Sequence, residues 1–219
     1  MHGERKDAMT TAIQPKFLFD FGSPNAFMAH LVLPQIEART GVKFEYVPIL
    51  MGGLYKMTGN RSPGEAFAGI KNKLEYERLE SERFIRKHKI TSFRVNPHFP
   101  VNTLQIMRGA TAAQFEGCFE QYVRAVYAHM WEQGRKMDDP AVILQALKDS
   151  GLDGEAIMAR SQAPEAKARL MANTQDAFDA GAFGSPSFLV GKELFFGKDR
   201  LGQVEEEIDA QRRVNLAPL

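Results

Sequence analysis

The sequence predicts an α/β fold in which one small sheet is interrupted by a long helical block. Three observations predict it. Residues 16–50 read as strand, helix and strand, residues 65–180 are mostly helical in texture, and residues 186–211 return to two strands and a helix. A single continuous sheet explains this order best, because either β segment alone is too small to bury a face.

The spacing of the apolar residues predicts the strand, helix and strand of residues 16–50. "KFLFDF" (16–21) is a short apolar run rich in aromatic side chains, which predicts a buried strand. "PNAFMAHLVLPQIEART" (24–40) has apolar residues at helical spacing, is followed by Gly41 as a stop signal, and contains Pro34, which predicts a kink. "VKFEYVPIL" (42–50) alternates and predicts a second strand. A right-handed crossover makes the two strands parallel.

The middle of the chain predicts helices with two interruptions. Residues 52–64 are rich in Gly, Pro and Asn and predict a loop. Residues 70–89 mix both charge signs around Ile70, Leu74, Leu79 and Phe84, which is typical of an amphipathic helix with a solvated face. Residues 92–102 predict a second loop. The other helical segments are 103–134, 139–151, 154–161 and 164–181.

The end of the chain completes the sheet. Residues 186–191 and 192–197 are two apolar runs separated by a tight turn, which predicts an antiparallel hairpin. Residues 199–211 predict a last helix, with Asp199 as a candidate cap. The whole order, βαβ, helical block, ββα, is the thioredoxin arrangement with a large all-helical insertion.

This arrangement divides the chain into three parts. We expect a loose tail over residues 1–14 and a discontinuous thioredoxin-like domain over residues 15–51 and 181–211. A helical insertion over residues 52–180 separates the two pieces of that domain.

Composition narrows the possible partners. The 219 residues carry 28 Lys and Arg against 27 Asp and Glu, so there is no electrostatic reason to expect nucleic acid or an anionic membrane as partner. The single cysteine, Cys118, excludes an intrachain disulfide, and no Cys/His spacing predicts a metal site. We interpret Cys118, in "EGCFEQY", as a packing residue on a helix. No secretory signal and no membrane-spanning run is found, so we expect a soluble, cytoplasmic protein.

The stretch "FDFGSPNAF" (19–27) allows two interpretations of Ser23. Serine followed by proline is typical of a helix start, where the hydroxyl accepts from free backbone amides. The predicted sheet also puts Ser23 at the C-terminal end of the first strand, where ligands gather in such folds. The local sequence alone favours the cap.

Two further stretches are predicted to lie near Ser23. "GAFGSPSF" (181–188) puts Pro186 at the mouth of the third strand. In a thioredoxin fold the proline here is cis and turns the preceding backbone toward a peptide-like ligand, whereas outside that fold an ordinary trans proline is the simpler reading. "FGKDRL" (196–201) puts Lys198 and Asp199 at the start of the last helix. Lys198 and Asp199 could bind a ligand carboxylate and amine. Alternatively, Asp199 caps the helix and the two side chains form a surface ion pair.

From Lys16 to Ile208 the chain resembles the family of 2-hydroxychromene-2-carboxylate isomerases and kappa-class glutathione transferases, which are relatives of the DsbA-type disulfide oxidoreductases. Five motifs in the same order carry the resemblance. They are "FDFGSPNAF", "TGNRSPG", "NPHFPVNT", "GAFGSPSF" and "FFGKDRL".

The resemblance implies a glutathione site. The serine matched by Ser23 hydrogen-bonds the glutathione sulfur, and the asparagine matched by Asn60 lines the site. The residue before the cis-proline, Ser185 before Pro186, pairs through its backbone with the cysteinyl part. The pair matched by Lys198 and Asp199 meets the γ-glutamyl end. Members of the family are usually dimers, which implies a homodimer.

The substrate half of the site departs from the family pattern. After Ser-Pro the family usually has an aromatic residue, and here Asn25 stands there. In naphthalene-pathway isomerases an aromatic follows the asparagine matched by Asn102, and here Thr103 follows it. Lys56 lies one residue out of register with a lysine of those enzymes. We keep Asn25, Asn102 and Thr103 as the candidate substrate contacts.

The bound thiol, rather than Ser23, is the expected nucleophile. A free thiol has a pKa of about 8.5 and is mostly protonated at neutral pH. A hydroxyl donor and a helix N-terminus both favour the thiolate, and together they supply about 1–3 kcal/mol. The turn Ser23-Pro24-Asn25-Ala26 has no cysteine, so this turn supplies no protein thiolate for disulfide exchange.

Three functional hypotheses follow. The first is a glutathione-dependent enzyme, either an isomerase that recycles the thiol after cis–trans isomerisation of an unsaturated aromatic 2-oxo acid, or a transferase that leaves the thiol on a small electrophile. The second is a non-catalytic glutathione or peptide binder. The third is a Ser/His/Asp hydrolase, which we disfavour because Ser23 lacks a G-x-S-x-G elbow and His30 reads as a helix-face residue.

Overall fold

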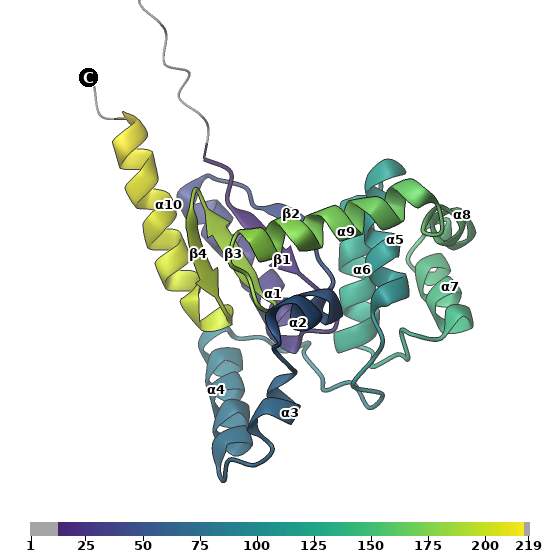
Figure 1. The fold of residues 1–219 in the computed structure, drawn as a ribbon, viewed down its shortest axis with the longest axis horizontal. Helices are drawn as coiled ribbons and strands as arrows, with labels where there is room; N and C mark the ends of the chain where they lie inside the picture. Colours follow the sequence, from purple (N-terminus) through teal and green to yellow (C-terminus); the bar gives the residue numbers. More distant parts are fainter. Residues whose placement is uncertain (1–12, 217–219) are drawn as a thin grey trace, which may run out of the picture.

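The computed structural model describes residues 13–216, so most of the expected tail over residues 1–14 lies outside the described residues. Four strands form one mixed sheet in the order β2-β1-β3-β4 (Figure 1). The strands are β1 (Lys16–Phe19), β2 (Glu45–Pro48), β3 (Ser187–Val190) and β4 (Glu193–Phe196). β1 is parallel to β2 and antiparallel to β3, and β3 and β4 form the hairpin. The predicted continuous sheet is confirmed.

The first helix has the bounds that its sequence signals predict. Ser23 accepts the N–H of Ala26 before its start, and Gly41 adopts a left-handed φ of 70° after its end. The helices are α1 (Pro24–Thr40), α2 (Met51–Thr58), α3 (Pro63–Phe67), α4 (Lys73–His88), α5 (Leu104–Phe115), α6 (Phe119–Trp131), α7 (Pro140–Asp149), α8 (Gly154–Arg160), α9 (Pro164–Asp179), the 3₁₀ turn η1 (Lys198–Arg200) and α10 (Leu201–Leu216). The thioredoxin fold with helices inserted between β2 and β3 is confirmed.

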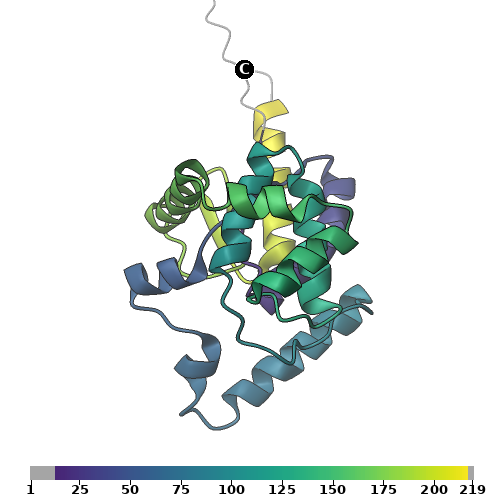
Figure 2. The same ribbon diagram turned by 90° about the vertical axis from the view of Figure 1, so that its right-hand side faces the viewer.

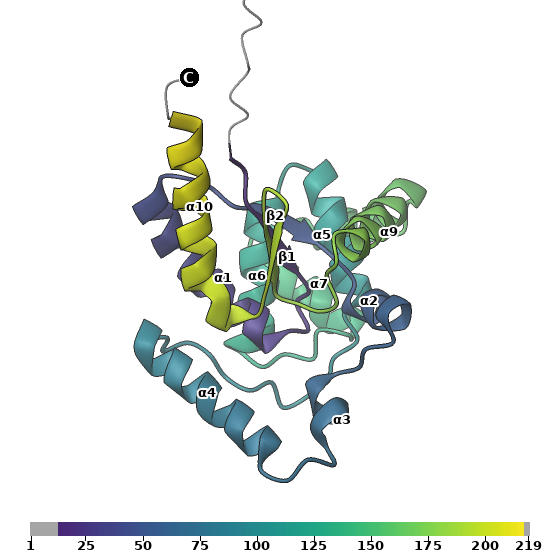
Figure 3. The ribbon, with the colours of Figure 1, turned by 60° about the vertical axis from the view of Figure 1, so that its left-hand side comes forward.

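Helices cover both faces of the sheet. Successive side chains of β1 point to opposite faces, and those on each face are apolar and pack in a core cluster. Phe17 and Phe19 are fully buried in the larger core cluster, which also takes residues from α1, α10, α5 and α6. Leu18 points the other way and packs with residues of α2 and α9 in a smaller cluster. Figure 3 shows α1 and α10 on one side of the strands and α2 and α9 on the other. The sheet end between these layers holds the candidate site.

The loop predicted at 52–64 is wrong, since α2 and α3 occupy most of it. The first backbone amides of α2 are satisfied by side chains far away in the sequence. The N–H of Leu50 is bound by Thr174 and that of Met51 by Asp20. α3 starts at a capping box formed by Ser62 and Glu65. Because the acceptors that cap α2 lie far away in the sequence, the residues around its start do not reveal the helix.

The helix predicted at 103–134 is two helices, α5 and α6. The chain breaks at Gly117, whose φ is 70°, and Cys118 takes the N-cap position of α6 instead of lying within a helix. This corrects the placement of Cys118. The thiol is half-buried, and burial raises its pKa.

α4 is attached more loosely than its sequence predicts. Phe84 is its buried residue, while Ile70 and Leu74, expected on the apolar side, are 55% and 43% exposed. Figures 2 and 3 show the blue α3 and α4 extending away from the sheet. The division into residues 15–51 and 181–211 against residues 52–180 stays a prediction, as does the kink at Pro34.

Candidate active site

Ser23 is both a helix cap and a hydrogen-bond donor. Its hydroxyl oxygen accepts the N–H of Ala26 at 3.1 Å, and the same hydroxyl donates to the backbone carbonyl of Ser185 at 2.8 Å. The side chain is buried, with 3% of the residue exposed, at the N-terminal end of the 17-residue α1. The two interpretations of Ser23 therefore do not compete, since one oxygen caps the helix and points its proton across the site.

The loop before β3 approaches Ser23 from the other half of the sheet. The Ser185–Pro186 peptide bond is cis, as the sequence predicts. The Ser185 hydroxyl accepts the backbone N–H of Asp20 at 3.0 Å. No described residue accepts a hydrogen bond from the backbone N–H of Ser185, although the residue is only 7% exposed. The Ser185 N–H therefore has no partner among the described residues, while the Ser185 carbonyl accepts the Ser23 hydroxyl.

Asn60 fastens the segment after α2 to this loop. Its side-chain amide donates to the carbonyl of Phe183 at 2.9 Å, two residues before Ser185. Asn60 itself is exposed at the surface. The structure thus brings Ser23, Asn60, Ser185 and Pro186 together from three of the five motifs.

Asp20 is the residue of this site that the sequence analysis missed. It follows β1 directly and is completely buried. One carboxylate oxygen accepts the N–H of Gly22 and the other that of Met51, both at 2.8 Å. Burial raises the pKa of Asp20, while these two amides and the Thr103 hydroxyl lower it. The available signal was an acidic residue between two phenylalanines of an apolar run.

Lys198 and Asp199 lie next to the cis-proline loop, because the N–H of Gly197 donates to the carbonyl of Pro186 at 2.9 Å. The Lys198 ammonium binds both carboxylate oxygens of Asp199, at 2.8 and 2.9 Å, and lies 4.9 Å from the ring centre of Phe84. Asp199 lies in η1, and no side-chain bond to the helix start is formed there. The expected surface ion pair is corrected in one respect, since Lys198 is only 3% exposed.

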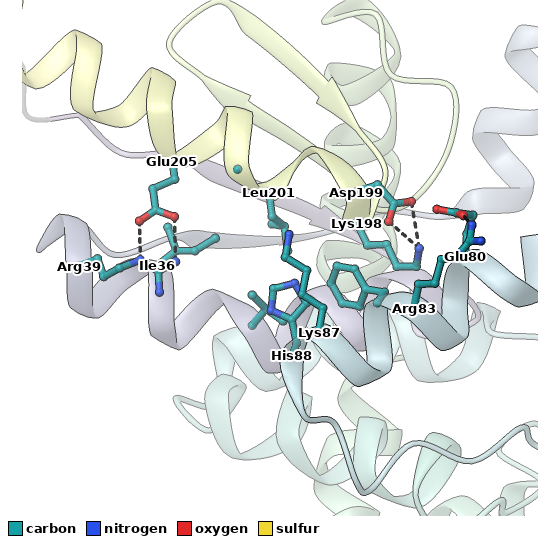
Figure 4. A pocket seen from close by; sticks show the side chains of 13 residues that line it. Ile36, Arg39, Glu80, Arg83, Lys87, His88, Lys198, Asp199, Leu201 and Glu205 are labelled. Atoms are coloured by element: carbon teal, nitrogen blue, oxygen red, sulfur yellow. Dashed lines mark hydrogen bonds and ion pairs between the residues drawn. The ribbon is translucent and has the colours of Figure 1, made fainter.

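This ion pair borders a cavity of about 360 Å³ between α1, α4 and α10 (Figure 4). Its far end is closed by a bidentate pair between Arg39 of α1 and Glu205 of α10. Ser23 does not line the cavity. The cavity therefore reaches the candidate site only through Lys198 and Asp199.

The three candidate substrate contacts do not share one surface. Asn25 is half-buried in the first turn of α1. Thr103 is buried, and its methyl group lies 3.0 Å from where a Cβ on Gly22 would be. Asn102 is exposed and lines a separate depression of about 500 Å³ with Arg108 and Asp138. Thr103 thus touches the turn that carries Ser23, while Asn102 belongs to another hollow.

His30 does not form a hydrolase pair with Ser23. Its Nδ1 is hydrogen-bonded to the Tyr46 hydroxyl at 2.8 Å, and its ring stacks on Tyr127 at 4.9 Å between centroids. Burial, assisted by the charge of Arg124, lowers the pKa of His30 to about 4. The bonds of the Ser23 side chain go to Ser185 and Ala26 instead, so no general base is within its reach among residues 13–216.

The described part of the chain has neither a metal-binding cluster nor a membrane-spanning helix. Residues 13–216 contain no group of three His, Cys, Asp or Glu side chains placed to hold a metal ion. No helix among them combines the length and the apolar character needed to cross a bilayer.

Comparison with known proteins decides the family. The model of the DsbA-like thioredoxin domain matches residues 16–209. The chain belongs to the DsbA-like thioredoxin domain family. This match covers the strands, the helical insertion and all five motifs, so the resemblance found in the sequence is confirmed.

Within this family, the chain is similar to isomerases and glutathione transferases. It is 27% identical to a 2-hydroxychromene-2-carboxylate isomerase of Sphingobium xenophagum, over 86% of this chain and 94% of that one. It is 22% identical to human glutathione S-transferase kappa 1, over 85% and 86%. A solved 2-hydroxychromene-2-carboxylate isomerase superimposes with a TM-score of 0.75 at 24% identity, covering 93% of this chain and 99% of that one. The last comparison supports the DsbA-like fold alone.

Proposed function

We propose that this protein is a glutathione-dependent enzyme that carries out the cis–trans isomerisation of an unsaturated aromatic 2-oxo acid of the 2-hydroxychromene-2-carboxylate type. The names of its relatives support this class of reaction. The observation that carries the proposal is the hydrogen bond from the Ser23 hydroxyl to the Ser185 carbonyl. These are the donor and the acceptor that a cysteinyl residue needs, and in the structure they are hydrogen-bonded to each other.

Glutathione fits the site because Ser23 and Ser185 can exchange the hydrogen bond between them for hydrogen bonds to the ligand. The Ser23 proton turns from the Ser185 carbonyl to the incoming sulfur, which it stabilises as a thiolate together with the N-terminus of α1. The released carbonyl accepts a ligand N–H, and the free N–H of Ser185 donates to a ligand carbonyl. One internal bond is thereby exchanged for three bonds to the ligand.

The remaining residues bind the ends of the two ligands. Asp199 receives the γ-glutamyl amine and Lys198 the adjacent carboxylate, while Asn60 lines the site beside the cis-proline loop. When bound, glutathione supplies the thiolate that adds to a conjugated carbon and leaves after bond rotation. Asn25, Asn102 and Thr103 are the proposed contacts of the aromatic acid. A homodimer and a cytoplasmic location stay predictions.

Calorimetric titration with glutathione tests the proposal. Wild type is expected to bind, and Ser23→Ala to bind at least tenfold more weakly, because a charge-assisted hydrogen bond is lost. Asp139→Ala is the matched control, since Asp139 caps α7 by accepting the N–H of Ala141. It removes a helix cap outside the site, and its glutathione affinity should equal that of wild type. A wild-type protein that does not bind glutathione contradicts the proposal.

The fate of the thiol separates isomerase from transferase, which the kappa-class relatives keep as the second candidate. Substrate loss and free thiol are followed in the same cuvette. Constant thiol during turnover supports the isomerase, and thiol consumed in equal amount supports conjugation. Binding with neither reaction, unchanged between wild type and Ser23→Ala, points to a non-catalytic binder.

A further inference from the structure

Asp20 is a buried carboxylate that the proposed reaction does not use. None of its surface is exposed, so it cannot touch glutathione or substrate. Taking a carboxylate out of water is costly unless donors surround it. Its two backbone donors come from the turn at Gly22 and the start of α2 at Met51, and the Thr103 side chain before α5 also lowers its pKa. The carboxylate thus adds a link between the Ser23 turn and the start of α2, which the bond from the Ile49 N–H to the Phe19 carbonyl also holds close together.

The backbone of Asp20 is bonded to both site residues. Its N–H donates to the Ser185 hydroxyl at 3.0 Å, and its carbonyl accepts the N–H of Ser23 at 3.0 Å. The hydroxyl of Ser23 then donates to the carbonyl of Ser185 at 2.8 Å. These three bonds close a ring through Asp20, Ser23 and Ser185, so a movement of Asp20 changes the separation of the other two.

The carboxylate holds this ring in place from outside. Leu50, at the N-cap of α2, has no side chain that can cap the helix, and Asp20, the residue after β1, accepts the N–H of Met51 in its place. The same carboxylate fixes the turn through Gly22, one residue before Ser23. A Cβ on Gly22 would lie 3.0 Å from the Thr103 methyl group and 3.3 Å from the Asp20 carboxylate, so the turn packs closely against both side chains.

We propose that Asp20 is the positioning residue of the site, whose carboxylate holds the Ser23 turn and α2 so that the Ser23 hydroxyl and the Ser185 backbone stay at the separation a thiol ligand requires. The inference rests on the proposed function for its ligand, although its effect on the turn does not. Thr103 is then a support of Asp20 as well as a candidate substrate contact.

The test uses Asp20→Asn, which keeps the shape of the side chain. Its NH₂ group must face either the N–H of Gly22 or that of Met51, so one of these two hydrogen bonds is lost. Glutathione affinity, measured by calorimetry, is expected to fall about tenfold. In the Ser23→Ala background the same change is expected to cost less than about twofold, because residues that act as a unit are not additive. Equal losses in both backgrounds, or no loss in wild type, overturn the inference.

A second measurement does not depend on glutathione. In Asp20→Asn, amide hydrogen exchange should accelerate at Gly22, Ser23 and Met51 and stay unchanged in α7. Asp139→Asn, which makes the same substitution at the cap of α7, is the matched control and should leave these three amides unaffected. If wild type binds no glutathione, the proposed function fails, while exchange still decides the role of Asp20. Unchanged exchange at the three amides overturns it.

If Asp20→Asn does not fold, Thr103→Val removes, at constant shape, the hydroxyl that favours the charged form of Asp20. It should weaken glutathione binding and accelerate exchange at Gly22 in the same direction, by a smaller factor. A Thr103→Val protein with wild-type affinity and exchange contradicts the inference as well.

Discussion

At the scale of single residues, His30 shows how burial sets a proton equilibrium. The ring lies between Tyr46 and Tyr127, and its pKa is lowered to about 4. In the unfolded chain a histidine has a pKa of about 6.5. Between these two values the unfolded chain binds the proton and the folded one does not. Folding is therefore weakened as pH falls through this window.

The resulting prediction concerns the pH dependence of stability. Between pH 7 and pH 5, His30 should remove about 2 kcal/mol from the free energy of unfolding, a loss that His30→Gln lacks. Urea unfolding of both proteins at the two pH values measures the difference. His98→Gln, measured in the same way, controls for the substitution of an exposed histidine. Equal losses in wild type and His30→Gln contradict the prediction.

At the scale of elements, local signals decide which parts of the fold the sequence predicts. α1 has its cap, its proline and its terminal glycine within its own segment, and its bounds are predicted at both ends. α2 takes its caps from Asp20 and Thr174, which lie 31 and 124 residues away, and it was mistaken for a loop. The candidate site likewise combines features with a local sequence signal and features that depend on tertiary contacts. Its motifs are local, while the burial of Lys198 and the contacts of Asp20 depend on the tertiary structure.

The packing of α5 on α6 also depends on one residue that periodicity does not reveal. The Tyr122 hydroxyl donates to the carbonyl of Ile106 at 2.9 Å and passes directly over Gly109. A Cβ at Gly109 would lie 2.1 Å from that hydroxyl. Glycine is thus required there by the close approach of the two helices.

Gly109→Ala is therefore expected to lower the free energy of unfolding by about 3 kcal/mol, despite the higher helix propensity of alanine. Denaturant unfolding measures it. Gly202→Ala is the matched control, since Gly202 lies within α10 and a Cβ there meets nothing within 4 Å. That variant should be equally or more stable than wild type. A Gly109→Ala protein as stable as Gly202→Ala shows that the helices separate without cost.

At the scale of the whole molecule, the candidate site joins the two ends of the chain. Ser23 and Ser185 are 162 residues apart, and the helices from α2 to α9 lie between them in sequence. Any ligand that bridges them binds the folded chain and not the unfolded one. Its binding must raise the stability of the entire fold, by about 2.7 kcal/mol at a concentration one hundred times its dissociation constant.

This coupling allows the contact between the Ser23 hydroxyl and the ligand sulfur to be measured from thermal unfolding. Glutathione should raise the midpoint of wild type more than S-methylglutathione at equal concentration, because the methylated sulfur carries no charge and is a weak acceptor. In Ser23→Ala the difference between the two shifts should shrink, since the hydroxyl donor is absent and only the N-terminus of α1 still favours the thiolate.

The γ-glutamyl contacts provide the control for this comparison. Asp199→Asn weakens the proposed γ-glutamyl contact, which both ligands share, so it should reduce both shifts and preserve their difference. If the difference between the two ligands is as large in Ser23→Ala as in wild type, the sulfur does not lie beside this hydroxyl. The N-terminus of α1 would then have to stabilise the thiolate through its backbone amides, with Ser23 serving only as the helix cap.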